Sequence, residues 1–146
     1  MFTADQFVAH AVGDYLLQSD WMANEKTKKS VAALAHAICY SLPFLFLTLS
    51  IPALLVIAST HFVIDRWRLA RYVVWAKNFL APPTDGMKSY GENGTLHVQI
   101  RWWHPWSECS GTGYHKDRPP FLAVWLLIIA DNVMHISINA LALRYL

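Results

Sequence analysis

Three pairs of a histidine and an aspartate stand four residues apart in apolar stretches of the sequence. They are His10 with Asp14, His61 with Asp65 and, in reversed order, Asp131 with His135. On an α-helix, residues i and i+4 share a face, so the imidazole and the carboxylate of each pair would point the same way. Ionisable groups are costly in apolar helices and usually mark a site where they occur. These pairs are therefore the first candidates for chemistry.

A fourth histidine, His36, is predicted to join the pair His61 and Asp65. The uncharged run of residues 30–64 is long enough for two helices that meet at Ser50, because a proline two residues later suits the first turn of a new helix. At 1.5 Å per residue, His36 lies about 21 Å before this turn, and His61 and Asp65 lie about 16 and 22 Å after it. We therefore expect the three side chains at one level of a helical hairpin.

Together these side chains predict a metal site. Nitrogen and oxygen ligands without thiolate suit catalytic zinc, iron or manganese, and we predict one or two divalent transition metal ions, with zinc as the first choice. Seven ligands are more than one tetrahedral ion needs. A two-metal centre, with a bridging aspartate and an activated water, would use all of them. The predicted ligands are His10, Asp14, His36, His61, Asp65, Asp131 and His135.

Basic residues beside the apolar segments could bind an anionic group. Lys28, Lys29, Arg66 and Arg68 lie just beyond these segments, where they could hold a phosphate or an anionic lipid headgroup. The net charge of +2 is too small to indicate a nucleic-acid partner, and we expect none.

The composition is that of a membrane protein, with 55% hydrophobic residues and 15% charged residues, where soluble domains have about 25% charged. We predict an all-α fold in one membrane domain over residues 1–146. Its bundle of about four helices would span about 5–24, 30–49, 52–80 and 119–144, with a polar, tryptophan-rich loop at 81–118. The basic flanks place their segments in the cytoplasm, which predicts a multi-pass protein of the inner (cytoplasmic) membrane in contact with the lipid bilayer. Whether the first, amphipathic helix spans stays open.

The loop holds further histidines and several tryptophans. His97, His104 and His115, with Glu108 and Cys109 nearby, match no standard zinc-finger spacing. We interpret them as surface residues, with a loop metal site as the alternative. The tryptophans at 102, 103 and 106 are typical of an anchor at the membrane interface. The two cysteines give no disulfide framework.

Four short segments carry a family resemblance. Residues 9–18, 36–40, 61–65 and 130–135 together resemble the bacterial and phage membrane family labelled domain of unknown function 3307, over all four helices but not over the loop at 82–118. This resemblance implies membership and no activity. More distantly, the His-x-x-x-Asp pairs look like ligand pairs of zinc-dependent phospholipase C and P1-type nucleases and of membrane-bound metal-dependent hydrolases. That likeness implies that the paired residues bind zinc.

These patterns predict a membrane-embedded, metal-dependent hydrolase. Its substrate would be a phosphoester or ester, such as a lipid headgroup or a nucleotide-like group, at the cytoplasmic face of the membrane. One alternative is a non-enzymatic bacterial or phage membrane protein with a structural metal or a purely hydrogen-bonded polar core. Another is a proton or metal transporter, since Asp and His inside membranes also build proton paths. The sequence does not identify a catalytic residue, a substrate or an oligomeric state.

Overall fold

The computed structural model describes residues 2–78, 87–90, 93–94, 96–99 and 104–146. The chain divides into two compact units where the sequence predicted one domain. Met1–Leu69 with Ile129–Leu146 form the first, here called the helical unit, and Ala70–Ile128 form the second, here called the loop unit.

The helical unit contains seven helical segments, and the last of them begins in the loop unit. They are α1 (Ala4–Ala11), the π-helix η1 (Val12–Leu16), α2 (Asp20–Glu25), α3 (Ser30–Ser41), the 3-10 helix η2 (Leu42–Phe46), α4 (Ile51–Trp67) and α7 (Pro120–Tyr145). Serine side chains start two of them, because Ser19 Oγ accepts a hydrogen bond from the amide of Met22 and Ser50 Oγ accepts one from Ala53. The fold is helical in this unit, as predicted.

Three predicted helices are shorter or more divided than expected. The helix predicted at 5–24 widens into the π turn of η1, and Ser19 then caps a new helix. The helix predicted at 30–49 tightens into a 3-10 turn and ends at Phe46. The helix predicted at 52–80 ends at Trp67, because Arg68 adopts a left-handed backbone conformation (φ 51°), and α5 (Ala70–Asn78) follows in the loop unit.

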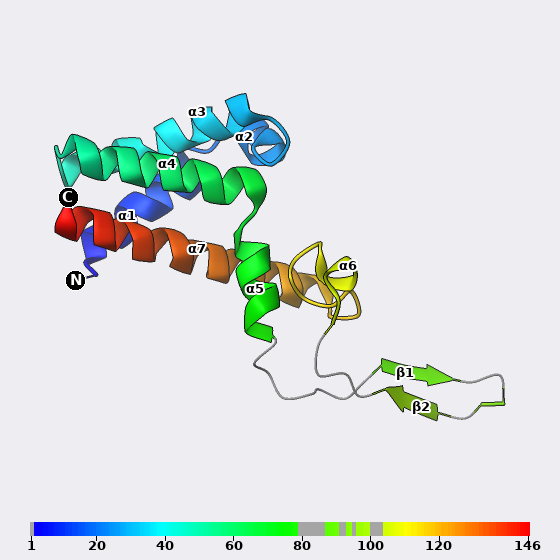
Figure 1. Cartoon of the computed structure of the whole chain (residues 1–146). Helices are drawn as coiled ribbons and strands as arrows, with labels where there is room; N and C mark the ends of the chain where they lie inside the picture. The colour runs from blue at the N-terminus through cyan, green and yellow to red at the C-terminus, as the bar shows by residue number, and fades with distance from the viewer. Residues whose placement is uncertain (1, 79–86, 91–92, 95, 100–103) are drawn as a thin grey trace. The chain divides into compact units, whose positions relative to one another are not determined.

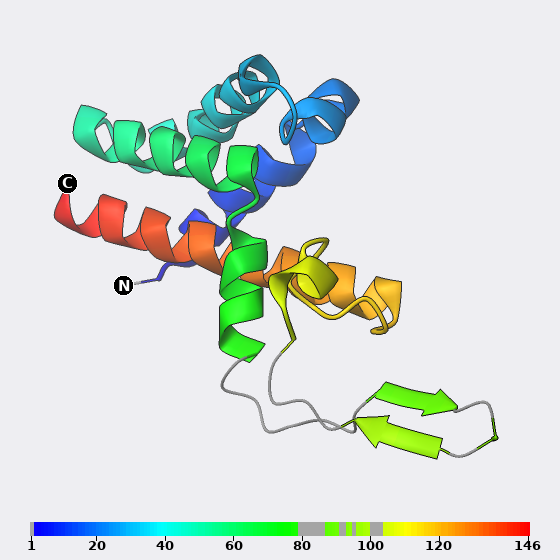
Figure 2. The same ribbon diagram turned by 45° about the vertical axis from the view of Figure 1, so that its right-hand side comes forward.

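Neighbouring helices of the helical unit run antiparallel, as Figure 1 and Figure 2 both show for α4 and the C-terminal half of α7. At one end of that pair, Ser50 Oγ donates a hydrogen bond to the carbonyl oxygen of Leu146 (2.7 Å). Helix α3 returns along α4, with Arg66 Nε donating to Ser30 Oγ (3.2 Å). Helix α1 lies along α7, where Gln6 Nε2 donates to the carbonyl oxygen of Ile136 (2.6 Å). This arrangement brings the middles of the helices together.

Small residues allow the helices to approach closely. Ala32, Ala33 and Ala37 of α3 are fully or almost fully buried. At Gly13 in η1, a Cβ would lie only 2.6 Å from the carbonyl oxygen of Tyr40, so no other residue fits there without movement. The core beside this contact consists of Ala9, Tyr40, Phe44, Ile57 and Ala142.

The loop unit has more regular structure than the irregular loop predicted at 81–118. Strands β1 (Met87–Tyr90) and β2 (Leu96–Gln99) form an antiparallel pair, and α6 (Trp106–Cys109) follows. The ring of Trp106 stacks on Tyr72 of α5, with ring centroids 4.5 Å apart, and its role as an interface anchor stays a prediction. The other two predicted anchors, Trp102 and Trp103, lie outside the described residues.

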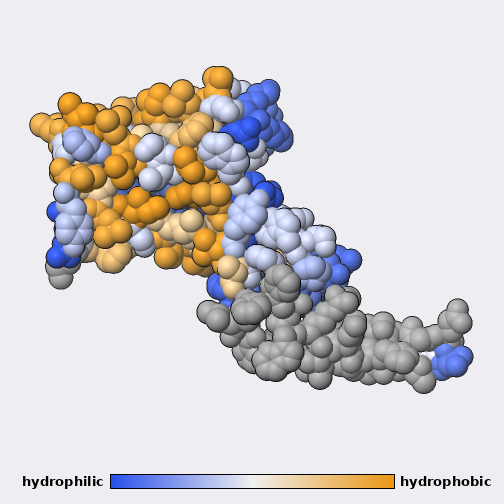
Figure 3. Space-filling model, in the orientation of Figure 1, coloured by the Kyte–Doolittle hydropathy of each residue, from blue (hydrophilic) through white to orange (hydrophobic). Residues whose placement is uncertain are grey.

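One helix of the described part of the chain, α7, is long and apolar enough to cross a membrane, and 11% of its most apolar stretch is buried. The apolar segment Ser30–Phe46 is shorter. Length and composition therefore indicate association with a membrane through one helix, while the predicted bundle of four spans is not established. Figure 3 shows that much of the visible surface of the helical unit is nevertheless hydrophobic.

Candidate metal centre

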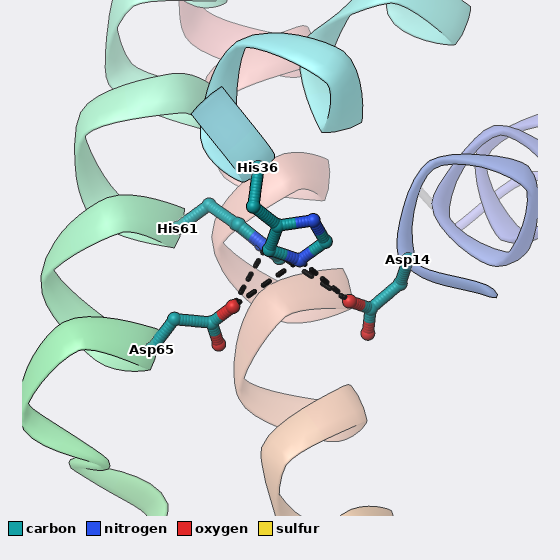
Figure 4. A group of neighbouring side chains, drawn as sticks. All are labelled: Asp14, His36, His61 and Asp65. Carbon is teal, nitrogen blue, oxygen red and sulfur yellow. Dashed lines mark hydrogen bonds and ion pairs between the residues drawn. The ribbon is translucent and has the colours of Figure 1, made fainter. Parts of the chain in front are cut away.

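Two carboxylates and two imidazoles converge inside the helical unit. Asp14 comes from η1, His36 from α3, and His61 and Asp65 from α4, and each offers one ligand atom within 4.8 Å of the other three. Figure 4 shows the two carboxylates reaching from opposite sides toward the imidazoles. All four residues are buried, and both histidines are fully so. Four of the seven predicted ligands therefore form one group, which could hold a metal ion.

The spacing of these atoms suits a tetrahedral ion. His36 Nε2 lies 3.1 Å from Asp14 Oδ1 and 3.3 Å from Asp65 Oδ2. His61 Nε2 lies 3.2 Å from Asp65 Oδ2 and 3.9 Å from Asp14 Oδ1. Neighbouring ligands of a tetrahedral zinc ion with bonds of about 2.0–2.2 Å are about 3.4 Å apart. Four of the six separations are therefore near those of a tetrahedral zinc site, and the other two are at most 4.8 Å.

Several polar atoms of this group lack a hydrogen-bond partner among the described residues. They include both ring nitrogens of His61 and Nδ1 of His36, whereas Oδ2 of Asp65 has no hydrogen bond but forms an ion pair with Lys26. The 3.2 Å approach of His61 to Asp65 is short, but the two groups are not aligned for a hydrogen bond. An unsatisfied buried polar group costs about 1–3 kcal/mol. A bound cation would remove that cost for the atoms that face it.

Lys26, between α2 and α3, reaches into the group and was not predicted to belong to it. Its Nζ lies 2.8 Å from Asp65 Oδ2, 3.8 Å from Asp14 Oδ1 and 3.2 Å from His36 Nε2. The ammonium thus neutralises part of the charge of the two carboxylates. In the sequence, Lys26 is one of several lysines that flank an apolar segment, and its position ten residues before His36 is the only signal that could have singled it out.

A second group adjoins the first through Asp65. His135 Nε2 lies 3.8 Å from Asp65 Oδ1, and the other nitrogen, Nδ1, lies 2.9 Å from the backbone oxygen of Asp131 and 3.4 Å from its carboxylate. If Nδ1 carries the ring proton and donates it in a hydrogen bond to that backbone oxygen, Nε2 keeps a free lone pair. This is the usual state of a histidine that binds a metal. Because its two oxygens face different groups, Asp65 is placed as a bridging carboxylate would be.

His10 lies outside both groups, although it was predicted to be a ligand. Its Nδ1 is 2.8 Å from the hydroxyl of Tyr40, and its Nε2 is 2.7 Å from Asn132 Oδ1. Asn139 Nδ2 donates to the same hydroxyl (2.6 Å). His10 is therefore satisfied by a hydrogen-bonded network, whose other members (Tyr40, Asn132 and Asn139) were not predicted from the sequence. The π turn of η1 directs Asp14 toward His36, away from the i+4 pairing with His10 that a regular helix would favour.

Three of the four residues predicted to bind an anion, Lys28, Lys29 and Arg66, form ion pairs or hydrogen bonds with nearby protein groups. Lys28 and Lys29 both pair with Glu25, at 3.4 and 2.9 Å, and the hydrogen bond from Lys29 lowers the pKa of the Glu25 carboxyl. Arg66 donates to Ser30 and to the backbone oxygen of Thr27. Arg68 is the left-handed residue that ends α4. Lys26 is thus the basic residue whose ammonium meets the buried carboxylates.

Comparison with known families adds one finding. The model of the family described as protein of unknown function (DUF3307) matches residues 2–90, which is more than half of the chain. The chain belongs to this family. The residues that match the DUF3307 model include Asp14, His36, His61 and Asp65, whereas Asp131 and His135 lie beyond them, so the likeness predicted for residues 130–135 stays a prediction. No curated protein and no solved structure matches the chain.

Proposed function

We propose that the helical unit is a membrane-embedded, zinc-dependent hydrolase of phosphoesters or esters. The observation that carries this proposal is the group of four buried ligand atoms from Asp14, His36, His61 and Asp65, in which each imidazole nitrogen lies 3.1–3.9 Å from both carboxylates. Two imidazoles with two carboxylates and no thiolate favour a hydrolytic metal over a structural zinc site built from cysteines. Zinc is the proposed metal.

A metal ion held by these four side chains would take a water as a fifth ligand or in place of one carboxylate oxygen, and it would supply a lowered pKa for that water and polarisation of the ester or phosphoryl oxygen. The two imidazoles and two carboxylates hold the ion in place, and burial excludes competing water. Asp65, with Asp131 and His135, could hold a second ion through its other oxygen. With the carboxylates engaged by metal, the Lys26 ammonium becomes available to a phosphate oxygen, which is the role that the sequence predicted for Lys28 and Lys29.

The membrane location is supported by the surface of the helical unit. Large apolar side chains on four helices are exposed, including Val8, Val31, Leu34, Ile38, Leu55, Val133 and Leu141. Helix α4 has 17 residues, and α3 with η2 covers another 17, which is at the lower limit of about 17 residues for a span. We propose that these segments join α7 in crossing the inner membrane, with the basic flanks at the cytoplasmic face.

The first test is the metal content of the full chain in detergent. We expect at least one equivalent of zinc in the wild type and in Asp20→Asn, a control at an exposed aspartate of α2, and loss of that zinc in Asp65→Asn and His61→Asn. Hydrolysis of bis(p-nitrophenyl) phosphate or p-nitrophenyl acetate should disappear with EDTA and return with zinc. Equal zinc in all four proteins, or no zinc in any, would contradict the proposal.

A second candidate is a non-enzymatic protein with a polar core, and the contact of Lys26 with Asp65 favours it. An ammonium among two carboxylates can neutralise them without a metal. Lys26→Met separates the two cases. If the hydrolase proposal is correct, this variant keeps or gains zinc affinity because a competing cation is removed. If the Lys26 ammonium alone neutralises the buried carboxylates, the variant is strongly destabilised and binds no zinc.

A transporter is distinguished by a separate measurement. Proton or zinc flux into proteoliposomes that is abolished by Asp131→Asn, without hydrolysis of either ester, would replace the hydrolase proposal.

A further inference from the structure

The loop unit holds its own group of ligand-type side chains. His104, Glu108 and His115 each offer one ligand atom within 4.8 Å of the other two. The three residues lie within twelve positions of the chain and outside the residues that match the family model. The group therefore does not belong to the site proposed in the helical unit, and the inference below does not rest on that site's function.

Glu108 lies between the two histidines. Its Oε2 is 3.0 Å from His115 Nε2 and 3.8 Å from His104 Nδ1, and the centroids of the two imidazole rings are 4.2 Å apart. The side chains of His104 and Glu108 are 28% and 26% exposed, whereas that of His115 is 6% exposed. An ion could therefore reach the group from solvent while one ligand stays anchored inside.

The backbone that carries these ligands is braced. Trp75 Nε1 of α5 donates to the carbonyl oxygen of His104 (3.0 Å), and Arg71 Nη1 donates to that of Ser110 (3.0 Å). The amide of Lys116 donates to the carbonyl oxygen of Glu108 (3.2 Å). These bonds fix the start, the middle and the end of the stretch, so the ligands are held close together before any ion binds, which favours affinity.

Gly113 makes this bracing possible. Its φ is +84°, and a Cβ there would collide with the carbonyl oxygen of Arg71 and with the side chain of Val74. Asn78 Nδ2 donates to the carbonyl oxygen of Gly113 (3.3 Å). The close contact with α5 at this glycine brings His115 back toward α6.

Asp117 is placed to support His115 as a ligand. Nδ1 of His115 accepts a hydrogen bond from the amide of Asp117 (3.3 Å) and lies 3.4 Å from the Asp117 carboxylate. In this state the ring proton is on Nε2, which donates to Glu108. An ion bound to Nε2 would shift the ring proton to Nδ1, which would then give up the hydrogen bond from the Asp117 amide and could donate one to the Asp117 carboxylate. A carboxylate behind the distal nitrogen is a common partner of metal-bound histidines.

We propose that His104, Glu108 and His115 form a second, solvent-accessible site for a divalent transition metal. Two histidines and one carboxylate are the ligand set of open zinc sites and of some iron(II) sites. Three protein ligands leave at least one coordination position for water or for an anionic ligand from solution. Asp117 is a positioning residue of this site.

The test uses the full chain, stripped of metal with EDTA and titrated with Co²⁺ and Zn²⁺. Glu108→Gln and His104→Gln should each bind one equivalent less than the wild type, with loss of the corresponding cobalt absorption in the visible range. Ser107→Ala, which changes an exposed neighbour on α6, is the matched control and should bind as many equivalents of metal as the wild type. Asp65→Asn, in the helical unit, should keep the equivalent that this site binds.

Two further observations separate a metal site from a merely structural role. Asp117→Asn should keep the number of equivalents but weaken zinc binding at this site by about tenfold or more. Circular dichroism of the Glu108 and His104 variants should match the wild type, because both side chains are partly exposed. Equal cobalt stoichiometry in Glu108→Gln, His104→Gln and Ser107→Ala would overturn the proposal. It would also be overturned if a variant lost its bound metal ion only when its circular dichroism showed a loss of helix.

Discussion

The two ligand groups of this protein use the same side-chain chemistry in opposite settings. The helical unit brings Asp14, His36 and the pair His61 and Asp65 together from three segments, all buried. The loop unit takes three ligands from residues 104–115 and leaves two of them about a quarter exposed. The first group exists only when α3, α4 and η1 have packed. The second depends on one braced stretch of chain.

This difference has an energetic consequence. A buried carboxylate without a compensating cation is strongly unfavourable, so the helical unit must be compensated by a metal, by Lys26 or by both. The carboxylate of Glu108 can remain partly hydrated. We therefore expect changes in the helical group to affect folding and metal binding together, and changes in the loop group to affect metal binding alone.

The largest effect is expected for Asp65→Ala. Asp65 contacts Lys26, His36 and His61, and removal of one partner from a buried ionic group costs about 3–5 kcal/mol. Chemical denaturation should show a loss of this size, and the zinc content should fall. A loss below about 1 kcal/mol would mean that the group is not a tightly coupled ionic core. Glu108→Ala is the comparison in the loop unit and should leave the denaturation midpoint nearly unchanged.

A smaller effect is expected for Gly13→Ala. The added Cβ would meet the carbonyl oxygen of Tyr40 at 2.6 Å and push η1, with Asp14, away from α3. Overpacking of this kind costs about 1–3 kcal/mol, and zinc affinity of the helical unit should fall with it. Gly111→Ala is the matched control, since a Cβ there meets nothing within 4 Å. Unchanged zinc binding in Gly13→Ala would show that Asp14 is not a required ligand.

The rate of metal loss should also distinguish the two groups. A chromophoric chelator added to the zinc-loaded chain should remove metal in two phases, because the loop group is open to solvent and the helical group is buried. Glu108→Gln should abolish the fast phase, and His61→Asn the slow one. A single phase that both variants change equally would contradict the separation of the sites.

The smallest effect is expected for Lys28→Ala. Lys28 pairs with Glu25 on the surface, and such exposed pairs add little to stability. The melting midpoint and the zinc content should both stay at the wild-type values. A clear loss of hydrolysis in Lys28→Ala would return this lysine to the substrate-binding role that the sequence predicted.

The sequence predicted the centre of the site well where regular geometry applied. The count from the turn at Ser50 placed His36 level with His61 and Asp65, and the structure confirms this with His36 Nε2 at 3.3 Å from Asp65 Oδ2. The i,i+4 pairing of His61 with Asp65 is likewise confirmed at 3.2 Å. A regular helical rise was sufficient for both predictions.

Other features depend on irregular backbone, which periodicity does not reveal. The π turn of η1 separates Asp14 from His10, and no residue pattern in the sequence marks that extra residue per turn. Lys26 looked like a flanking charge because its contacts arise from the return of the chain between α2 and α3. The loop group was only an alternative interpretation, since Glu108 and His115 meet through a turn set by long-range hydrogen bonds to α5.

The central claim is that Asp14, His36, His61 and Asp65 bind zinc, and X-ray absorption at the zinc edge tests it most directly. The sample is the full chain carrying Glu108→Gln, so that the loop group does not contribute. The account predicts at least one zinc per chain, with a four- or five-coordinate shell of nitrogen and oxygen at about 2.0–2.2 Å and imidazole scattering from two histidines. This signal should be lost when Asp65→Asn is added. Absence of zinc, or the same spectrum in both proteins, would contradict the account.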